Sequence, residues 1–140
     1  MELTNQIQLE LYFADHFDTI LFPVLADIYF NQEDYRRSRK VCNIGLGYHE
    51  NDAAGRFVLA KVEKAEGNLK EAEKELKQVL KYDRKNANTL NALGYSLTIH
   101  TERYEEAYNF IHQAYHYDPG SPAILDSLAW ILYKKGEFTH

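Results

Sequence analysis

Two histidines, His112 and His116, are the residues whose type and spacing come nearest to a metal site. Four residues apart on a helix, they would place both rings on one face. A stable zinc site needs three or four ligands. Asp118 could reach the pair, but the sequence offers no HExxH or CxxC motif to complete a set. We therefore expect a solvated histidine pair, with no metal and no other cofactor.

The charged run from Lys70 to Lys77 contains carboxylates that could be taken for a paired acid and base. Glu71 and Lys74 are three residues apart, and Glu73 and Lys77 are four apart, which is the spacing of ion pairs on a helix surface. Such pairs contribute only tenths of a kcal/mol each. The run is predicted to be a solvated helix face.

The sequence contains no other motif that indicates an enzyme. There is no glycine-rich phosphate loop, no GxSxG motif and no Cys and His pairing typical of an activated nucleophile. Cys42 is the only cysteine, so it cannot form an internal disulfide, and we expect it to be a small buried apolar group. The chain is predicted not to be an enzyme.

Composition is that of an ordered chain, with 45% hydrophobic and 26% charged residues, and 140 residues suit one domain. The net charge of -5 argues against nucleic-acid binding, and no apolar stretch approaches the roughly 20 residues that span a bilayer. No secretory signal is visible at the N-terminus, so we expect a cytoplasmic protein. The alternative is the bacterial periplasm or envelope, if a signal has been removed.

The elements that must position these residues repeat along the chain. Leu25-Ala26 recurs 34 residues later as Leu59-Ala60, and Leu93-Gly94 and Leu128-Ala129 follow at spacings of 34 and 35. A period of 34 is that of helix-turn-helix repeats. Small residues at these places let paired helices approach closely, and each pair needs a stacked neighbour to cover its remaining face.

The chain resembles the tetratricopeptide-repeat (TPR) family, and residues 87–135 resemble bacterial TPR proteins in particular. The third copy carries the family pattern most fully, on Leu90, Leu93, Gly94, Leu97, Ala107, Ile111 and Pro119. The second copy departs from it by placing Arg56 at a position that is usually large and apolar, and Arg84 where proline is usual.

This resemblance implies an all-α fold, a right-handed α-solenoid of antiparallel helix pairs. We expect one TPR domain over 1–140, with an N-terminal helix in 1–18, repeats at 19–52, 53–86 and 87–121, and a half repeat at 122–140. Gly67 and Gly136 are predicted turns, and Asn68 and Ser121 are predicted N-caps. Helices are expected near 5–14, 19–31, 35–48, 53–65, 69–82, 87–100, 104–117 and 122–135.

In TPR proteins the first helix of each pair lines a concave groove that binds a peptide. The family's groove positions fall here on Asp27, Phe57, Lys61, Lys64, Asn88, Asn91, Tyr95, Asp126 and Trp130, with Pro23, Phe30, Thr98 and Tyr133 beside them. Lys61 and Lys64 near Asn88 and Asn91 favour peptides of acidic character. The set does not match the carboxylate clamp that grips the acidic tails of heat-shock chaperones, so we do not expect that partner.

The C-terminal half repeat lacks its own second helix within this chain. Leu125, Ala129 and Leu132 would face that helix, and Trp130, Ile131 and Tyr133 add apolar area. Because monomers rarely expose such a patch, this end is a terminal cap, a junction to further repeats or the interface of a symmetric homodimer. A scaffold that binds a protein or peptide partner is the predicted function, with an assembly module that self-associates here as the alternative. Neither function involves nucleic acid or membrane insertion.

Overall fold

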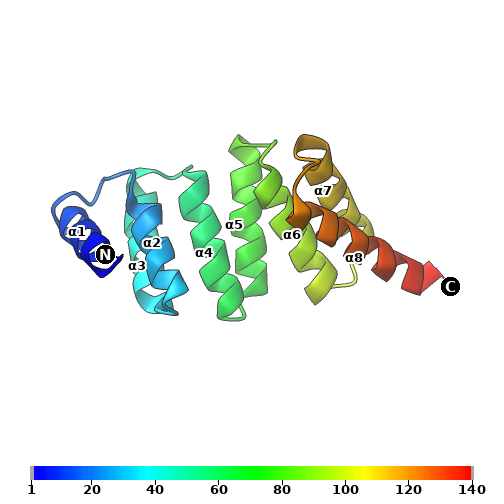
Figure 1. The fold of residues 1–140 in the computed structure, drawn as a ribbon, viewed down its shortest axis with the longest axis horizontal. Coiled ribbons are helices and arrows are strands. Elements are labelled where there is room, and N and C mark those ends of the chain that lie inside the picture. Colours follow the sequence, from blue (N-terminus) through cyan, green and yellow to red (C-terminus); the bar gives the residue numbers. More distant parts are fainter. Residues whose placement is uncertain (1, 140) are drawn as a thin grey trace. The chain divides into compact units, whose positions relative to one another are not determined.

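The computed structural model describes residues 2–139, which form eight α-helices (Figure 1). Its internal contacts divide the chain into two compact units, Met1–Val79 and Leu80–His140. Helices adjacent in sequence pack on one another from α1 to α4 and from α6 to α8, as the repeat predicts. Within this described part of the chain, no helix combines the length and the apolarity that crossing a membrane requires.

The first unit contains α1 (Glu2–Asp15), α2 (Phe22–Asn31), α3 (Tyr35–Tyr48), α4 (Ala53–Ala65) and most of α5 (Leu69–Tyr82). α2 packs against α3 and α4, and α1 lies against α2. The core is formed by apolar side chains that recur at helical spacing, so that each helix buries one stripe. Its fully buried members include Phe22, Leu25, Ala26, Cys42 and Val62.

Close helix approach in this unit depends on two glycines. The ring of Phe22 occupies the space that a Cβ atom would need at Gly45 in α3 and at Gly55 in α4. One aromatic ring therefore fills the gap between three helices, and any side chain at either glycine would overpack it. Ser38 of α3 also links the two helices, because its hydroxyl donates a hydrogen bond of 2.7 Å to the carbonyl oxygen of Ala26 in α2.

An ion pair replaces an apolar contact where the second copy departs from the family pattern. Arg56 Nη1 of α4 lies 2.6 Å from Glu75 Oε1 of α5, and the side chains are 17% and 18% exposed. Arg56 Nε also donates to the carbonyl oxygen of Glu50 at 2.9 Å. A charge at this half-buried position is tolerated because both partners are supplied.

The second unit contains the end of α5, α6 (Ala87–His100), α7 (Tyr104–Tyr117) and α8 (Pro122–Thr139). α8 lies across α6 and α7 and packs on both. A Cβ atom at Gly94 would lie 2.9 Å from the carbonyl oxygen of Ala107, so α6 and α7 meet almost backbone to backbone there. Leu90, Leu93, Ile111, Ile124 and Ile131 are fully buried around this crossing.

Helix bounds agree with the sequence prediction from α3 to α7. Three predicted bounds need correction. The first helix extends over Glu2–Asp15, and α2 begins only at Phe22, because residues 17–21 form turns. The third correction is at Gly136, predicted as a turn, which lies inside α8. A glycine costs a helix only about 1 kcal/mol, and contacts made by Lys135 with Glu105 and Tyr108 hold this turn of α8 against α7.

Helix starts carry side-chain caps at the repeat spacing. Asp52 accepts from the Gly55 N–H at 2.8 Å, Asn86 from Thr89 N–H at 3.0 Å and Ser121 from Ile124 N–H at 3.3 Å. These bonds satisfy donors that the first turn of a helix leaves unpaired. The predicted cap at Ser121 is confirmed, and those at Asp52 and Asn86 were not anticipated.

The turns between paired helices put a left-handed residue at the same place in the first two copies. Gly67 has φ 84°, and Glu33, which lies 34 residues earlier, has φ 61°. The predicted turn at Gly67 is confirmed. A residue other than glycine is strained in the left-handed region of backbone conformation by roughly 1 kcal/mol or more.

We expect Gly67→Ala to lower the free energy of unfolding by about 1 kcal/mol, and Glu33→Gly to raise it by a few tenths to about 1 kcal/mol. Urea unfolding followed by circular dichroism measures both. Gly120→Ala is the control, because no atom lies within 4 Å of its added Cβ and its φ is not in the left-handed region. Equal effects at positions 67 and 120 would contradict the prediction.

Candidate binding groove

Side chains predicted to line the groove come together in the first unit around Lys61. Its Nζ atom lies 2.6 Å from Asp27 Oδ1, 4.9 Å from the centre of the Phe30 ring and 5.9 Å from that of Phe57. Asp27 and Lys61 occupy equivalent places in successive copies, on α2 and α4, so stacking of the two helices brings them into contact. The cluster combines one ion pair with two aromatic faces.

The remaining predicted residues of this unit behave differently. Lys64 is partly buried, and burial lowers the pKa of its ammonium group. Pro23 is buried, so it does not line an accessible groove. The charge of Lys61 is already paired with Asp27. In this unit, therefore, Lys61 no longer supports the expectation that the groove prefers an acidic peptide.

A pocket beside this cluster was missed in the sequence. It has a volume of about 440 Å³ and is lined by Asn5 and Gln6 of α1 and by Ile28, Asn31 and Gln32 of α2. Gln6 and Gln32 donate hydrogen bonds to each other at 3.3 and 2.7 Å. Asn31 directly follows the predicted groove residue Phe30 on α2, so the repeat pattern could have indicated that it lies near the groove. Asn5 and Gln6 belong to a helix outside the repeat, so the repeat pattern gave no indication of their position.

In the second unit, α6 presents Asn88, Asn91 and Tyr95. Asn88 is exposed, and the Tyr95 side chain is 42% exposed. The Oδ1 atom of Asn91 is buried and has no hydrogen-bond partner among the described residues. Thr98, also expected in the groove, is buried and donates to the carbonyl oxygen of Gly94 at 2.8 Å, so its hydroxyl serves α6 itself.

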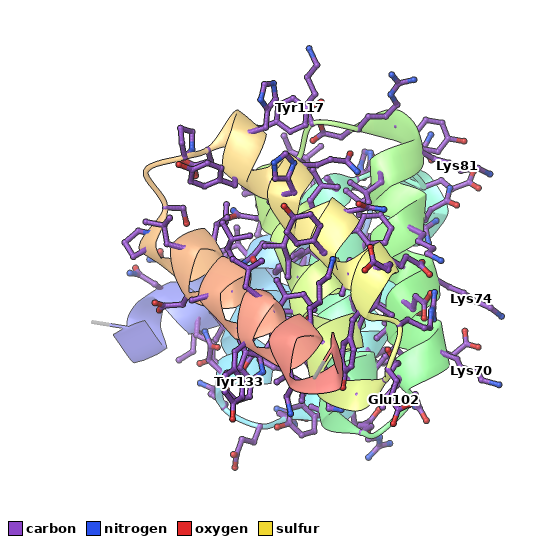
Figure 2. The ribbon with its side chains drawn as sticks, turned by 90° about the vertical axis from the view of Figure 1, so that its right-hand side faces the viewer. Lys70, Lys74, Lys81, Glu102, Tyr117 and Tyr133 are labelled. Carbon is purple, nitrogen blue, oxygen red and sulfur yellow. The ribbon has the colours of Figure 1, made fainter. Side chains whose placement is uncertain are left out.

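The predicted residues of α8 are accessible. Asp126 is exposed, and Trp130, which is 39% exposed, stacks on Tyr133 with ring centres 5.5 Å apart. Lys134 Nζ lies 5.3 Å from the centre of the Trp130 ring. Figure 2 shows the Tyr133 side chain on the outside of α8. This end of α8 therefore offers an aromatic surface beside a cation.

The face of α8 that lacks a second helix is uncovered. Leu125 and Leu132 are 44% and 51% exposed, and Ala129 is exposed between them. Their counterparts on α6, Leu90 and Leu97, are buried, because α7 covers that face of α6. Ile131 was expected to add to this patch, but the structure shows otherwise. It is fully buried, on the side of α8 that packs on α6 and α7.

Residues considered for chemistry lie elsewhere. His112 is exposed and stacks on Tyr108, and no group of three His, Cys, Asp or Glu residues within 2–139 is arranged to hold a metal ion. Cys42 is buried as predicted, and burial raises the pKa of its thiol to about 12, which keeps it protonated and unreactive near neutral pH.

The charged run of α5 has the geometry of a solvated face. Lys77 Nζ lies 2.8 Å from Glu73 Oε2, and Lys74 Nζ lies 3.4 Å from Glu71 Oε1. The side chains of Lys70 and Lys74 point outward from the helix in Figure 2. The predicted surface pairs are confirmed, and the carboxylates are not gathered in a cleft.

Comparison with known proteins agrees with this architecture. Residues 53–86 match the tetratricopeptide repeat family. The TPR repeat-containing protein PA4667 of Pseudomonas aeruginosa is 32% identical over 117 residues, which are 84% of this chain and 20% of that protein. The chain thus spans about a fifth of the length of this relative.

Two solved structures show the same fold with bound peptides. The first TPR of Spaghetti (RPAP3), bound to the HSP90 peptide SRMEEVD, aligns with a TM-score of 0.77 and 13% identity over 85% of this chain and 94% of that one. The Yersinia enterocolitica type III secretion chaperone SycD, in complex with a peptide of the translocator YopD, aligns with a TM-score of 0.71 and 17% identity, over 81% of this chain and 92% of that one.

The helix pairs, their 34-residue spacing and the small residues where they cross define a helical repeat protein. The chain belongs to the tetratricopeptide-repeat family, and the predicted TPR-like fold is confirmed.

Proposed function

We propose that the chain is a protein-interaction module that binds a peptide or a partner segment along its first helices. The observation that carries this proposal is a contrast between neighbouring positions. Asp27, Lys61 and Tyr95 remain accessible, whereas the residues just before them, Ala26, Ala60 and Gly94, are buried in the helix crossings. In each unit, the repeat thus holds polar or aromatic side chains accessible on the first helices, next to small residues buried at the crossings.

The chemistry of these accessible side chains suits a peptide. Aromatic side chains supply contact area with few rotatable bonds to immobilise. The peptides bound by the two related TPR structures support the same class of ligand.

The test uses a phage-displayed library of random 12-residue peptides, selected on the whole chain. We expect each selected peptide to lose about tenfold or more in affinity on Phe57→Ala or on Tyr95→Ala, without a change in the melting temperature. Tyr48→Ala is the control, because Tyr48 is 61% exposed at the end of a second helix. Equal losses at Tyr48 and at the groove positions would contradict the proposal.

A second function, assembly through α8, is favoured by the uncovered face of Leu125, Ala129 and Leu132. Apolar side chains on such a face are stabilised when a second copy covers them. This function and peptide binding use different residues, so one chain can perform both.

We expect the chain to form a symmetric dimer at high concentration, and Leu125→Glu with Leu132→Glu to keep it monomeric, because two buried carboxylates per chain would lose their hydration. Light scattering across a concentration series measures the mass. Tyr82→Glu, at a 62% exposed position on α5, is the control for added charge. A wild-type chain that stays monomeric throughout would exclude the dimer.

A further inference from the structure

The pocket between α1 and α2 has a lining of unusual uniformity. Four of its five residues, Asn5, Gln6, Asn31 and Gln32, carry primary amides, and the fifth is Ile28. None of them is ionisable. The reciprocal hydrogen bonds of Gln6 and Gln32 join α1 to α2 at its wall.

A lining of this kind selects its ligand by hydrogen bonding. A primary amide offers both donors and an acceptor, which is the set that a peptide backbone requires. A charged group that entered the pocket would lose hydration and find no opposite charge in the lining. An uncharged chain with regularly spaced N–H and C=O groups meets neither difficulty.

One helical turn before Asn31, Asp27 holds the charge of Lys61. The Nζ to Oδ1 distance is 2.6 Å, and the ammonium group also faces the rings of Phe30 and Phe57. An acidic ligand side chain would have to displace Asp27 before it could pair with Lys61. Asp27 therefore stands where a ligand carboxylate would otherwise bind, and the site has two aromatic faces beside a neutralised charge.

We propose that the amide-lined pocket and the cluster around Lys61 together form one site, which binds an extended, uncharged peptide segment. The peptide backbone pairs with the amides of Asn5 and Asn31, and an apolar side chain of the peptide contacts Phe30 and Phe57. Asp27 is its specificity-determining residue, because it excludes acidic segments. The proposal rests on the proposed function and narrows it to one ligand class. It also makes α1, an element outside the repeats, one wall of the site.

The experiment selects phage-displayed random 12-residue peptides in parallel on the wild-type chain and on Asp27→Asn, a nearly isosteric change. We expect the wild type to enrich uncharged peptides and Asp27→Asn to enrich acidic ones. A synthetic acidic peptide so obtained is expected to bind Asp27→Asn at least about tenfold more tightly than the wild type, with an affinity that falls as salt rises. Adding Lys61→Met to Asp27→Asn is expected to abolish that gain.

The amide wall is tested with peptides enriched on the wild type. Asn5→Ala with Asn31→Ala is expected to weaken their binding about tenfold or more, since two hydrogen bonds are lost. Gln8→Ala is the matched control, because Gln8 is an exposed amide of α1 that does not line the pocket. Circular dichroism melts show whether each variant is folded.

The outcomes separate the two proposals. A library that enriches no peptide on the folded wild-type chain counts against the proposed function. Peptides that bind but are indifferent to Asn5→Ala with Asn31→Ala overturn the inference alone. So does an acidic peptide that the wild type binds as tightly as Asp27→Asn does.

Discussion

Replacing Gly94 by leucine is expected to lower the free energy of unfolding by about 3 kcal/mol or more. A Cβ atom at this position would meet the carbonyl oxygen of Ala107 at 2.9 Å as well as the side chain of Ile111. Side chains can change rotamer to make room, but a backbone oxygen moves only if α6 and α7 separate. Overpacking costs 1 to 3 kcal/mol in ordinary cores, and a backbone clash lies at the upper end or beyond.

Thermal and urea unfolding measure this loss, and Gly47→Leu is the matched control. Gly47 also lies inside a helix, but no atom lies within 4 Å of its added Cβ. There leucine is expected to stabilise the chain by up to about 1 kcal/mol, through its better helix propensity. Two variants that unfold alike would mean that Gly94 does not lie at a helix crossing.

The second large effect is expected at the ion pair of Arg56 and Glu75. Glu75→Leu alone should lower the free energy of unfolding by about 2 to 3 kcal/mol, because it leaves a half-buried guanidinium without its carboxylate. Breaking a fully buried pair costs about 3 to 5 kcal/mol, and the 17% and 18% exposure of these side chains reduces that figure.

The double variant Arg56→Leu with Glu75→Leu is expected to regain most or all of the loss. It restores the apolar contact that the family pattern places at position 56, and it leaves no charge unpaired. A double-mutant cycle in urea gives the coupling energy. Lys74→Leu is the control, because the Lys74 and Glu71 pair is exposed and its loss should change stability by less than about 0.5 kcal/mol. A double variant no more stable than Glu75→Leu would contradict the expected apolar replacement.

Periodicity predicted the parts of the fold that the repeat controls. The bounds of α3 to α7 follow from it because each copy carries the same apolar spacing, small crossing residues and turn. The contact of Asp27 with Lys61 could have been predicted in the same way, since opposite charges at one repeat position meet when the helices stack.

The parts that periodicity does not control could not be predicted. α1 lies outside the repeat, so nothing in the sequence indicated that Glu10 would accept a hydrogen bond from Tyr29, or that Asn5 would line a pocket. That contact has its own electrostatic effect, because burial and the bond to Glu10 raise the pKa of Tyr29 to about 12. The buried state of Pro23 and Thr98 depends on helix rotation, which family positions specify only approximately.

The caps of α4, α6 and α8 have a consequence for the order in which the chain acquires structure. Asp52, Asn86 and Ser121 each start a helix with a bond to a residue three positions ahead, so no distant segment is needed. The helices then pack chiefly on neighbours close in sequence. Chains with such local contacts fold quickly, and the N-terminal parts of a chain generally fold first during synthesis. A ribosome should therefore release a chain whose early helix pairs are already formed.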